Sequence, residues 1–367
     1  MKVVYDHQIF SMQSYGGISR YFRELANGMA EITPADVQVS INCPFYINSY
    51  LPDAPSSFNV FGRHLPMFRG AVRLCRVANS VLSPILMGLL KPDIVHETYY
   101  SHQSSAPRYS RTVITVYDMI HELFPQSFSA EDRTSEVKRQ AVKRADHVIC
   151  ISEHTRQDLV RLFDVPIERT SVVHLGFSLT SSGIEQMDAP VRPYLLYVGM
   201  RGGYKNFETL LHAYASQPWL KENFDLVAFG GGGFTSYERA MIDQLGIVAH
   251  VHQQGGSDEV LAAYYKQAAL FVYPSLYEGF GIPPLEAMSY GCPVVCSNTS
   301  SIPEVVGAAA KMFDPCSAES LSAALLDVLQ SSETYEDLRR LGLARVKEFS
   351  WHRCALETHA IYQRILS

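Results

Sequence analysis

Short apolar runs alternate with longer mixed segments along most of the chain. In the first half, the runs that predict strands are Val3–Tyr5, Val37–Ile41, Ile94–His96, Val113–Tyr117, His147–Ile151 and Ser171–His174. Short runs that are apolar throughout are typical of strands buried on both faces of a sheet. Because the segments between them have a helical pattern, the sequence predicts parallel α/β sheets with helices on both faces.

A second series of the same kind follows a polar stretch, Ser178–Pro193, whose Ser-Ser-Gly sequence and prolines predict a linker. A chain of 367 residues also exceeds the size at which one core keeps growing. We therefore expect one domain over residues 1–185, a second over 190–347, and a terminal segment, 348–367, that carries a last helix. The strands predicted for the second domain are Tyr194–Gly199, Leu226–Phe229, Val248–His252, Leu270–Tyr273 and Val294–Cys296.

Composition narrows the class of protein. Hydrophobic residues make up 47% of the chain and charged residues 19%, which fits a globular enzyme. The net charge of −6 argues against nucleic acid as the main partner. The seven cysteines are odd in number and scattered, which predicts free thiols in a reducing compartment. No signal peptide is visible and no clean apolar run reaches about 18 residues, so we expect a cytoplasmic protein without a transmembrane helix.

The most informative segment follows the predicted strand Leu270–Tyr273. Two glycines, Gly279 and Gly281, flank an aromatic residue, and a Pro-Pro pair then stands where a helix would begin. Gly291 and Pro293 would end that helix about two turns later. The pattern predicts a strand, a glycine loop and a helix N-terminus, whose N–H groups bind anions.

Two carboxylates accompany this predicted anion site. Glu278 precedes the loop and Glu286 falls in the first part of the helix. Each could accept hydrogen bonds from hydroxyl groups beside the anion, and an anion with hydroxyl-rich groups on both sides describes a nucleotide sugar. A pair of carboxylates also serves a retaining glycosidase, as acid and nucleophile, so hydrolysis is an alternative.

Basic residues and further glycines follow other predicted strands. Arg201 and Lys205 come directly after Tyr194–Gly199, and ligands of doubly wound sheets bind at the carboxyl ends of the strands. Gly16 and Gly17 precede a helical pattern, where close backbone approach and free N–H groups suit a phosphate. Gly230–Gly233 are expected to line the same pocket, and His252–Gly255 to flank a base through backbone groups.

The motif E-G-F-G-x-P-x-L-E-A-M at residues 278–288, followed by G-x-P-V at 291–294, resembles the signature of retaining GT-B glycosyltransferases of family 4. The resemblance implies two Rossmann-like parallel-sheet domains that face a cleft, the first for the acceptor and the second for the nucleotide-sugar donor. It also implies a C-terminal helix that crosses back to pack on the first domain.

The resemblance also implies roles for individual residues. Arg201 and Lys205 would clamp the leaving diphosphate, and Gly16 and Gly17 would cap the donor phosphates from the first domain. Glu286 would bind the ribose hydroxyls and Glu278 would reach the transferred sugar. The N–H groups of the loop would hold the sugar and its phosphate, so the predicted donor-binding set also includes Phe280, Gly281, Ile282 and Leu285.

The sequence departs from the family pattern after the strand at Val113–Tyr117. Relatives often carry a His-Asp pair there, with the His near the donor sugar. Asp118 fits the Asp, but Tyr117 occupies the His position. Tyr117, Asp118 or His121, three residues further on, could face the sugar.

The predicted reaction is transfer of a hexose with retention at the anomeric carbon. Fixed cations can stabilise the diphosphate that leaves, and the chain contains no Asp-x-Asp element of the kind that metal-dependent transferases carry. We therefore expect no metal and no cofactor, with a UDP-sugar as the favoured donor and a GDP-sugar next. A GT-B epimerase or phosphorylase and a non-catalytic nucleotide-binding module remain alternatives.

The expected acceptor is a hydroxyl of a saccharide or a lipid-linked saccharide, in polysaccharide synthesis. No acidic residue occurs between Asp53 and Asp93, while apolar residues there are interleaved with Arg63, Arg69, Arg73, Arg76 and Lys91. A basic, apolar helix of this composition can lie on an anionic membrane surface. The alternative is a pair of core helices that cover the sheet.

Overall fold

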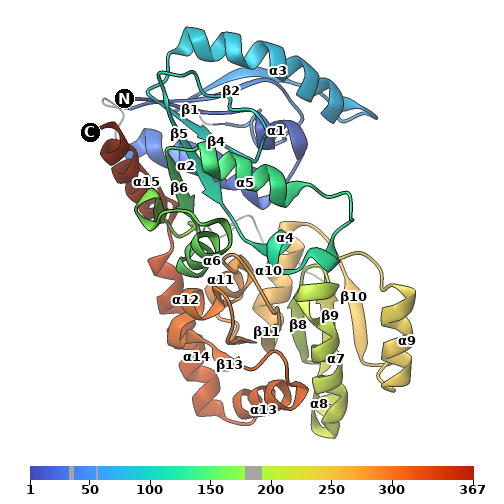
Figure 1. Cartoon of the computed structure of the whole chain (residues 1–367). Coiled ribbons are helices and arrows are strands. Elements are labelled where there is room, and N and C mark those ends of the chain that lie inside the picture. The colour runs from blue at the N-terminus through green and yellow to red at the C-terminus, as the bar shows by residue number, and fades with distance from the viewer. Residues whose placement is uncertain (33–36, 55–56, 178–191) are drawn as a thin grey trace. The chain divides into compact units, whose positions relative to one another are not determined.

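The computed structural model describes residues 1–32, 37–54, 57–177 and 192–367 (Figure 1). The described chain forms two compact units. The N-terminal unit contains residues 1–176 and 349–367, and the C-terminal unit contains residues 177–348. Of the predicted linker, residues 178–191 lie outside the described part of the chain.

The N-terminal unit contains a seven-stranded parallel sheet in the order β3-β2-β1-β4-β5-β6-β7. Its strands are β1 (Lys2–Tyr5), β2 (Gln38–Tyr46), β3 (Asn59–His64), β4 (Ile94–Glu97), β5 (Arg111–Val116), β6 (His147–Cys150) and β7 (Thr170–Val172). Its helices are α1 (Gln8–Met12), α2 (Gly17–Ile32), α3 (Ala71–Leu90), α4 (Ile120–Leu123), α5 (Thr134–Arg144), α6 (Glu153–Phe163) and α15 (Trp351–Leu366).

The C-terminal unit contains a six-stranded parallel sheet in the order β10-β9-β8-β11-β12-β13. Its strands are β8 (Tyr194–Val198), β9 (Asp225–Phe229), β10 (Val251–Gln254), β11 (Leu270–Tyr273), β12 (Val294–Ser297) and β13 (Lys311–Phe313). Its helices are α7 (Phe207–Ser216), α8 (Pro218–Asn223), α9 (Ser236–Gln244), α10 (Asp258–Gln267), α11 (Ile282–Ser289), α12 (Ile302–Val306), α13 (Ala318–Leu329) and α14 (Ser332–Arg345).

Each sheet has a point at which the strand order reverses. In the N-terminal unit the reversal lies between β1 and β4, and in the C-terminal unit it lies between β8 and β11. The chain leaves neighbouring strands in opposite directions at such a point and opens a crevice at their carboxyl ends. The loops that follow β1, β4, β8 and β11 are therefore where ligands are expected.

The sequence misses strands only at the margins of the sheets. The central strands are buried along their length, as continuous apolar runs predict. The edge strands β3 and β13 are absent from the prediction, and β10 begins three residues later than expected, at Val251. An edge strand is half covered and does not need an apolar run, so its hydrophobic signal is weak.

The C-terminal helix α15 packs on α2 and belongs to the N-terminal unit, as the family resemblance implies (Figure 1). The rings of Tyr21 on α2 and Trp351 on α15 lie 6.2 Å apart. A buried imidazole ties the helix to the sheet: His96 Nδ1 lies 2.6 Å from the Tyr362 hydroxyl, and His96 Nε2 lies 2.8 Å from the Thr115 hydroxyl. Burial lowers the pKa of His96 to about 3, so this imidazole is neutral.

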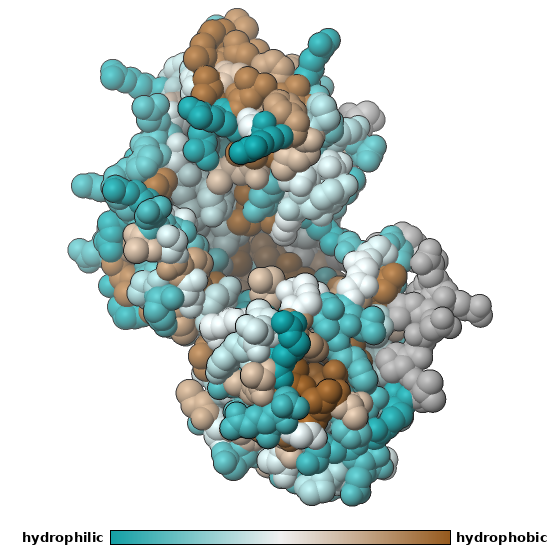
Figure 2. All heavy atoms as spheres, turned by 90° about the vertical axis from the view of Figure 1, so that its right-hand side faces the viewer, coloured by the Kyte–Doolittle hydropathy of each residue, from teal (hydrophilic) through white to brown (hydrophobic). Residues whose placement is uncertain are grey.

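Helix α3 has an unusual distribution of side chains. Its buried positions carry small, polar or flexible residues: Ala71, Cys75, Asn79, Ser83 and Met87. Its large aliphatic side chains face outward instead, including Val81, Ile85 and Leu89, which are 62%, 59% and 73% exposed. Figure 2 shows apolar side chains gathered at the top of the view, where Figure 1 places α3. The interpretation of residues 63–91 as a pair of core helices is therefore wrong, because the apolar side of this single helix does not face the core.

Helix α3 also has the length and mean hydropathy of a membrane-crossing helix. It is the only helix of that kind among the described residues. The sequence predicts no transmembrane helix because Arg73 and Arg76 interrupt the apolar run. Core helices of soluble proteins share this length and hydropathy. The inner side of α3 is committed to the sheet: Asn79 Oδ1 accepts the N–H of Phe45 at 2.9 Å, and the Asn42 amide donates to Ser83.

All seven cysteines lie in the described residues and are free thiols. Six of them are buried, and only Cys316 is exposed. Burial raises the pKa of the thiols for which a shift is resolved, Cys43, Cys75, Cys150, Cys292, Cys296 and Cys354. Thiols of this kind pack as small apolar side chains.

Candidate active site

The loop between β11 and α11 adopts the strand, glycine turn and helix that the sequence predicts. Gly281 has φ of +113° and caps α11, which begins at Ile282 and ends before Gly291. A side chain at residue 281 would be strained in this backbone conformation. Pro283 and Pro284 occupy the first turn and have no N–H, so the helix start offers the N–H groups of Gly281 and Ile282.

Glu278 lies buried at the start of this loop, and a lysine neutralises it. Lys205 Nζ lies 2.7 Å from Glu278 Oε1. Burial raises the pKa of the Tyr273 phenol, and the nearby Glu278 carboxylate raises it further, so this phenol stays neutral. The carboxylate therefore lies between a cation and a neutral phenol that can donate a hydrogen bond to it.

The backbone of the glycine loop is held by hydroxyls that follow β12. Ser300 Oγ accepts the N–H of Glu278 at 3.0 Å. Ser301 Oγ donates to the carbonyls of Glu278 and Phe280 at 2.8 and 2.9 Å, and Thr299 Oγ1 donates to the Leu276 carbonyl at 3.0 Å. These residues are absent from the sequence-based site, although a run of hydroxyls at the carboxyl end of the neighbouring strand was a signal for them.

The loop after β8 is fixed to the loop after β11, and this brings Lys205 to Glu278. The N–H of Leu276 donates to the Tyr204 carbonyl at 2.8 Å. The Asn206 amide donates to the carbonyls of Pro274 and Pro315, each at 2.9 Å. The two loops at the switch point of the C-terminal sheet therefore form one connected structure.

Arg201 comes from the same loop but is directed toward the glycines that follow β9. Its Nε lies 2.7 Å from Glu238 Oε1, and the guanidinium donates to the carbonyls of Gly230, Gly231, Gly232 and Gly233. It also lies over the Phe234 ring, 5.0 Å from its centroid. Arg201 thus holds the tetraglycine turn in shape, and its predicted contact with a diphosphate stays a prediction.

The tetraglycine turn requires glycine for a steric reason as well. Gly231 has φ of +69°, and a Cβ there would lie 2.7 Å from Arg201 Nη1 and 2.8 Å from the Gly199 carbonyl oxygen. The N–H of Gly230 donates to the Gln254 carbonyl at 2.9 Å, so the turn and the end of β10 are joined. The turn lies at the carboxyl edge of the sheet, where the sequence placed it.

Glu286 lies one helical turn into α11. The hydroxyl of Tyr265, on α10, donates to Glu286 Oε2 at 3.0 Å. Burial raises the pKa of Tyr265, and the Glu286 carboxylate adds to this rise, so the phenol remains a donor. The predicted contact of Glu286 with a ribose is not tested by this geometry.

His252 points away from the carboxyl edge. Its Nε2 lies 3.3 Å from Asp225 Oδ2, and Asp225 is the first residue of β9. The imidazole is therefore near the amino end of the sheet, whereas Gln254, at the end of β10, reaches the tetraglycine turn. Any contact with a base in this segment would involve the last residues of β10 and Gly255.

In the N-terminal unit, Gly16 and Gly17 lie at the predicted place, because α2 begins at Gly17. The carbonyl of Gly16 accepts the N–H of Arg20 and the hydroxyl of Ser19, each at 3.0 Å. No side chain or backbone atom lies within 4 Å of where a Cβ on Gly17 would be. The open face of this glycine would let a phosphate approach the helix start.

Asp118 follows β5 and is held in place by a buried lysine. Its carboxylate accepts the N–H of Ile120 at 3.0 Å, and Lys138 Nζ donates to its backbone carbonyl at 2.9 Å. Lys138 is only 1% exposed and pairs with Glu122 at 2.8 Å and, more distantly, with Asp118 at 3.8 Å. Lys138 lies 20 residues beyond Asp118 in the sequence. The sequence pattern therefore did not predict that it contacts Asp118.

The two other residues considered for this position face elsewhere. The Tyr117 side chain is buried, and its hydroxyl donates to the Thr98 carbonyl at 3.4 Å. His121 stacks on Phe128, with ring centroids 3.9 Å apart, and its Nε2 lies 3.9 Å from Asp132 Oδ2. Asp118 lies two residues after the end of β5, and its side chain is 30% exposed.

Two Rossmann-like units built on parallel sheets, with a C-terminal helix that returns to the first, are the GT-B architecture. The model for glycosyl transferases group 1 matches residues 188–344, and the model for glycosyltransferase family 4 matches residues 15–181. The chain belongs to this family of glycosyltransferases. The resemblance read from the Glu278–Met288 motif is therefore confirmed.

The chain is similar to bacterial mannosyltransferases. It is 33% identical to the O-antigen chain mannosyltransferase B of Escherichia coli over 278 residues, which cover 70% of this chain and 71% of that protein. It is 28% identical to the serotype-specific mannosyltransferase WbdA of Escherichia coli over 74% of this chain, but over only 37% of that longer protein.

Two solved structures share the whole fold at low sequence identity. Sucrose-phosphate synthase from Thermosynechococcus elongatus has a TM-score of 0.72 and 20% identity, with coverage of 100% of this chain and 99% of that one. Anabaena HepE in complex with UDP and glucose has a TM-score of 0.70 and 16% identity, with coverage of 99% of each chain. At this identity the likeness shows the fold.

Proposed function

We propose that the protein is a retaining, metal-independent hexosyltransferase that moves a hexose from a nucleotide diphosphate sugar to an acceptor hydroxyl in polysaccharide synthesis. The observation that carries the proposal is the pairing of Glu278 with Lys205 beside the start of α11. Lys205 and the N–H groups at the helix start can bind a diphosphate. The Glu278 carboxylate, in the same place, can accept hydrogen bonds from sugar hydroxyls. Membership of the family favours transfer over the hydrolysis that paired carboxylates also permit.

In the proposed reaction, the bond between the anomeric carbon and the diphosphate oxygen breaks, and a bond to the acceptor oxygen forms on the same face of the sugar. The acceptor proton passes to an oxygen of the leaving diphosphate. No protein nucleophile is required. Lys205 and the N–H groups at the start of α11 stabilise the negative charge that develops on the diphosphate, and Arg201 supports them through the tetraglycine turn.

Mannose is the sugar that we propose, because several proteins similar in sequence are named mannosyltransferases. UDP is the nucleotide that we favour, because it is the commonest in sugar donors, and GDP is the other candidate. A thermal-shift and calorimetric screen against UDP-mannose, UDP-glucose, UDP-galactose, UDP, GDP-mannose and GDP tests the sugar and the nucleotide separately. Stabilisation by none of these compounds would contradict the donor proposal.

Metal independence has its own test. We expect full activity after dialysis against EDTA, because Lys205 and the helix start supply the positive potential that a divalent ion supplies elsewhere. Loss of activity that added magnesium or manganese restores would exclude the metal-free scheme.

We further propose that α3 rests on an anionic membrane surface, which suits a lipid-linked acceptor. Its outward side chains are apolar, and basic residues accompany them without any acidic residue between Asp53 and Asp93. An exposed apolar stripe bordered by Arg73 and Arg76 complements a surface of acyl chains and negative headgroups.

A further inference from the structure

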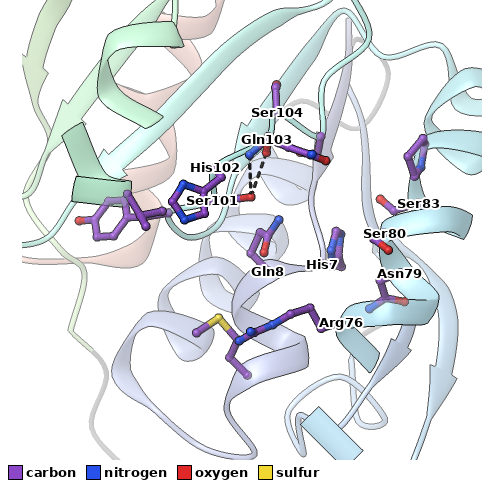
Figure 3. Close-up of a pocket in the computed structure, with 15 residues that line it drawn as sticks. His7, Gln8, Arg76, Asn79, Ser80, Ser83, Ser101, His102, Gln103 and Ser104 are labelled. Atoms are coloured by element: carbon purple, nitrogen blue, oxygen red, sulfur yellow. Dashed lines mark hydrogen bonds between the residues drawn. The ribbon is translucent and has the colours of Figure 1, made fainter. Parts of the chain in front are cut away.

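The pocket drawn in Figure 3, between α1, α3 and the loop that follows β4, lies in the unit that the family resemblance assigns to the acceptor. A feature outside that assignment is the turn between β12 and α12 in the C-terminal unit. The N–H of Ile302 donates to the Thr299 carbonyl at 3.3 Å, and this bond closes the turn over Ser300 and Ser301. The turn lies against the loop that carries Glu278.

Ser300 has a left-handed backbone, which is unusual for a serine. Its φ is +55°, whereas Ser301 has φ of −76° and ψ of −9°. A positive φ at the first central residue alone is the pattern of a type II′ turn, and glycine is the residue that adopts it without a steric penalty. A side chain in this conformation is strained, so the contacts of Ser300 must offset the strain in the folded chain.

The Ser300 hydroxyl makes the contact that offsets the strain. It accepts the N–H of Glu278 at 3.0 Å. The hydroxyl of Ser301, which is fully buried, donates to the Glu278 carbonyl at 2.8 Å. Two consecutive residues of one turn therefore hold both polar groups of the Glu278 backbone.

The carboxylate of Glu278 is held as well. Lys205 Nζ lies 2.7 Å from Glu278 Oε1, and the Tyr273 phenol is hydrogen-bonded to the carboxylate. Because both the backbone and the carboxylate are fixed, Glu278 has its orientation before any donor binds. Such preorganisation matters for rate, since a misplacement of about 1 Å can cost about 10²-fold.

We propose that Ser300 is a positioning residue, whose hydroxyl fixes the backbone of Glu278 so that the carboxylate meets the transferred sugar in its productive orientation. The proposal rests on the transferase function proposed above and on the role of Glu278 in it. Ser300 acts through Glu278 and touches neither substrate. Glycine at this position would relieve the strain, but it would also remove the hydroxyl that holds Glu278.

Two substitutions separate the hydroxyl of Ser300 from its strain. Ser300→Gly removes both, so kcat should fall about tenfold while stability stays the same or rises, because the relief of strain offsets the lost hydrogen bond. Ser300→Thr keeps the hydroxyl but adds a β-branch that disfavours a positive φ, so kcat should stay within about twofold while stability falls. If Ser300 had only a structural role, kcat would follow stability in both variants.

Turnover is measured as release of nucleoside diphosphate from UDP-mannose and from GDP-mannose, with α-linked mannobiose as the acceptor. The KM for the nucleotide sugar should stay within about twofold, since the hydroxyl acts on the reacting geometry and not on donor binding. Urea unfolding followed by Trp219 fluorescence in a Trp351→Phe background reports the stability of the C-terminal unit.

Asp164→Gly is the matched control. Asp164, at the end of α6, is exposed and also has a φ of +55°. Its replacement by glycine relieves the same kind of strain far from Glu278 in the sequence and should leave kcat unchanged. A fall in kcat that equals the fall in Ser300→Gly would overturn the positioning role.

Amide hydrogen exchange tests the hold on the backbone without any substrate. The Glu278 N–H should exchange about tenfold faster in Ser300→Gly than in the wild type, and at the wild-type rate in Ser300→Thr. Unchanged exchange in Ser300→Gly, or turnover of that variant at the wild-type rate, would refute the proposal. A wild type that transfers no sugar from either donor, although its exchange responds to Ser300→Gly, would refute the transferase function and leave the hold on Glu278 standing.

Discussion

Arg201 and Lys205 are close in sequence, but the structure gives them different tasks. Arg201 is buried against Glu238 and four consecutive carbonyls, while Lys205 is partly open and paired with Glu278. The sequence treats them as one clamp on a diphosphate. In the structure, the first fixes a turn and the second is the cation beside the glycine loop.

Separate substitutions should divide these tasks. Arg201→Ala should lower the free energy of unfolding by about 1–3 kcal/mol, because it leaves several glycine carbonyls and the partly buried Glu238 carboxylate without this donor. Lys205→Ala should cost less stability than Arg201→Ala, because Lys205 is partly exposed and Glu278 keeps the Tyr273 phenol as a donor, but it should weaken calorimetric binding of the nucleoside diphosphate. Equal stability of the two variants would show that Arg201 does not support the turn.

Glu278 is the residue on which turnover should depend most. Glu278→Gln keeps the shape of the side chain but removes its charge, and should reduce turnover about 10²-fold or more, the scale of one lost transition-state contact. Affinity for the nucleoside diphosphate should survive, since that part of the donor is held by other groups. Glu333→Gln, on the exposed side of α14, serves as the control for the substitution itself. Turnover at the wild-type rate in Glu278→Gln would remove this residue from the reaction.

At the scale of elements, a neutral imidazole joins α15 to the N-terminal sheet. His96 joins β4, β5 and α15, and its pKa is lowered to about 3 by burial. In the unfolded chain a histidine titrates near about 6.5. Between these two values the unfolded state binds more protons, so stability is complete above about pH 6.5 and falls as the pH is lowered toward 3.

The N-terminal unit should therefore unfold more easily at pH 5 than at pH 7, and His96→Gln should make this difference smaller. His147 has a pKa lowered to about 4 and will contribute part of the slope that remains. Urea unfolding followed by Trp351 fluorescence in a Trp219→Phe background reports this unit alone. An identical pH dependence in His96→Gln and its parent would mean that this imidazole does not govern the acid sensitivity.

At the scale of the whole molecule, the exposed face of α3 is the surface that we propose for membrane contact. Val81→Asp with Ile85→Asp should reduce binding to phosphatidylcholine vesicles that contain phosphatidylglycerol by about tenfold or more, because apolar area is lost and a repelling charge is added. Both side chains are already exposed, so stability should change by less than about 0.5 kcal/mol per site. The matched control is Leu343→Asp, at an exposed position of α14 in the C-terminal unit.

Co-sedimentation with vesicles gives the readout, and added salt should weaken binding because the arginines contribute to it. Binding that is equal in the double variant and the wild type would exclude α3 as the contact. Self-association that the double variant abolishes, without any vesicle binding, would assign the same face to a second copy of the chain.

The sequence by itself determined the central strands, the two-unit division of the α/β fold and the turn from Glu278 to Glu286. These features depend on local chemistry: continuous apolar runs make buried strands, Gly281 permits a left-handed backbone, and Pro283 suits the first turn of a helix. The family motif is likewise a local signal, and it led to the GT-B fold that the structure and the comparisons confirm.

Tertiary structure alone decided which partners these residues have. The support of the glycine loop by Ser300 and Ser301, the pairing of Arg201 with Glu238 and the hold of Lys138 on Asp118 all join segments distant in sequence. The outward side of α3 and the left-handed backbone of Ser300 were also not readable from the sequence. Exposure and hydrogen-bond satisfaction depend on what packs against a side chain, and that is settled only when the sheet brings distant loops to one edge.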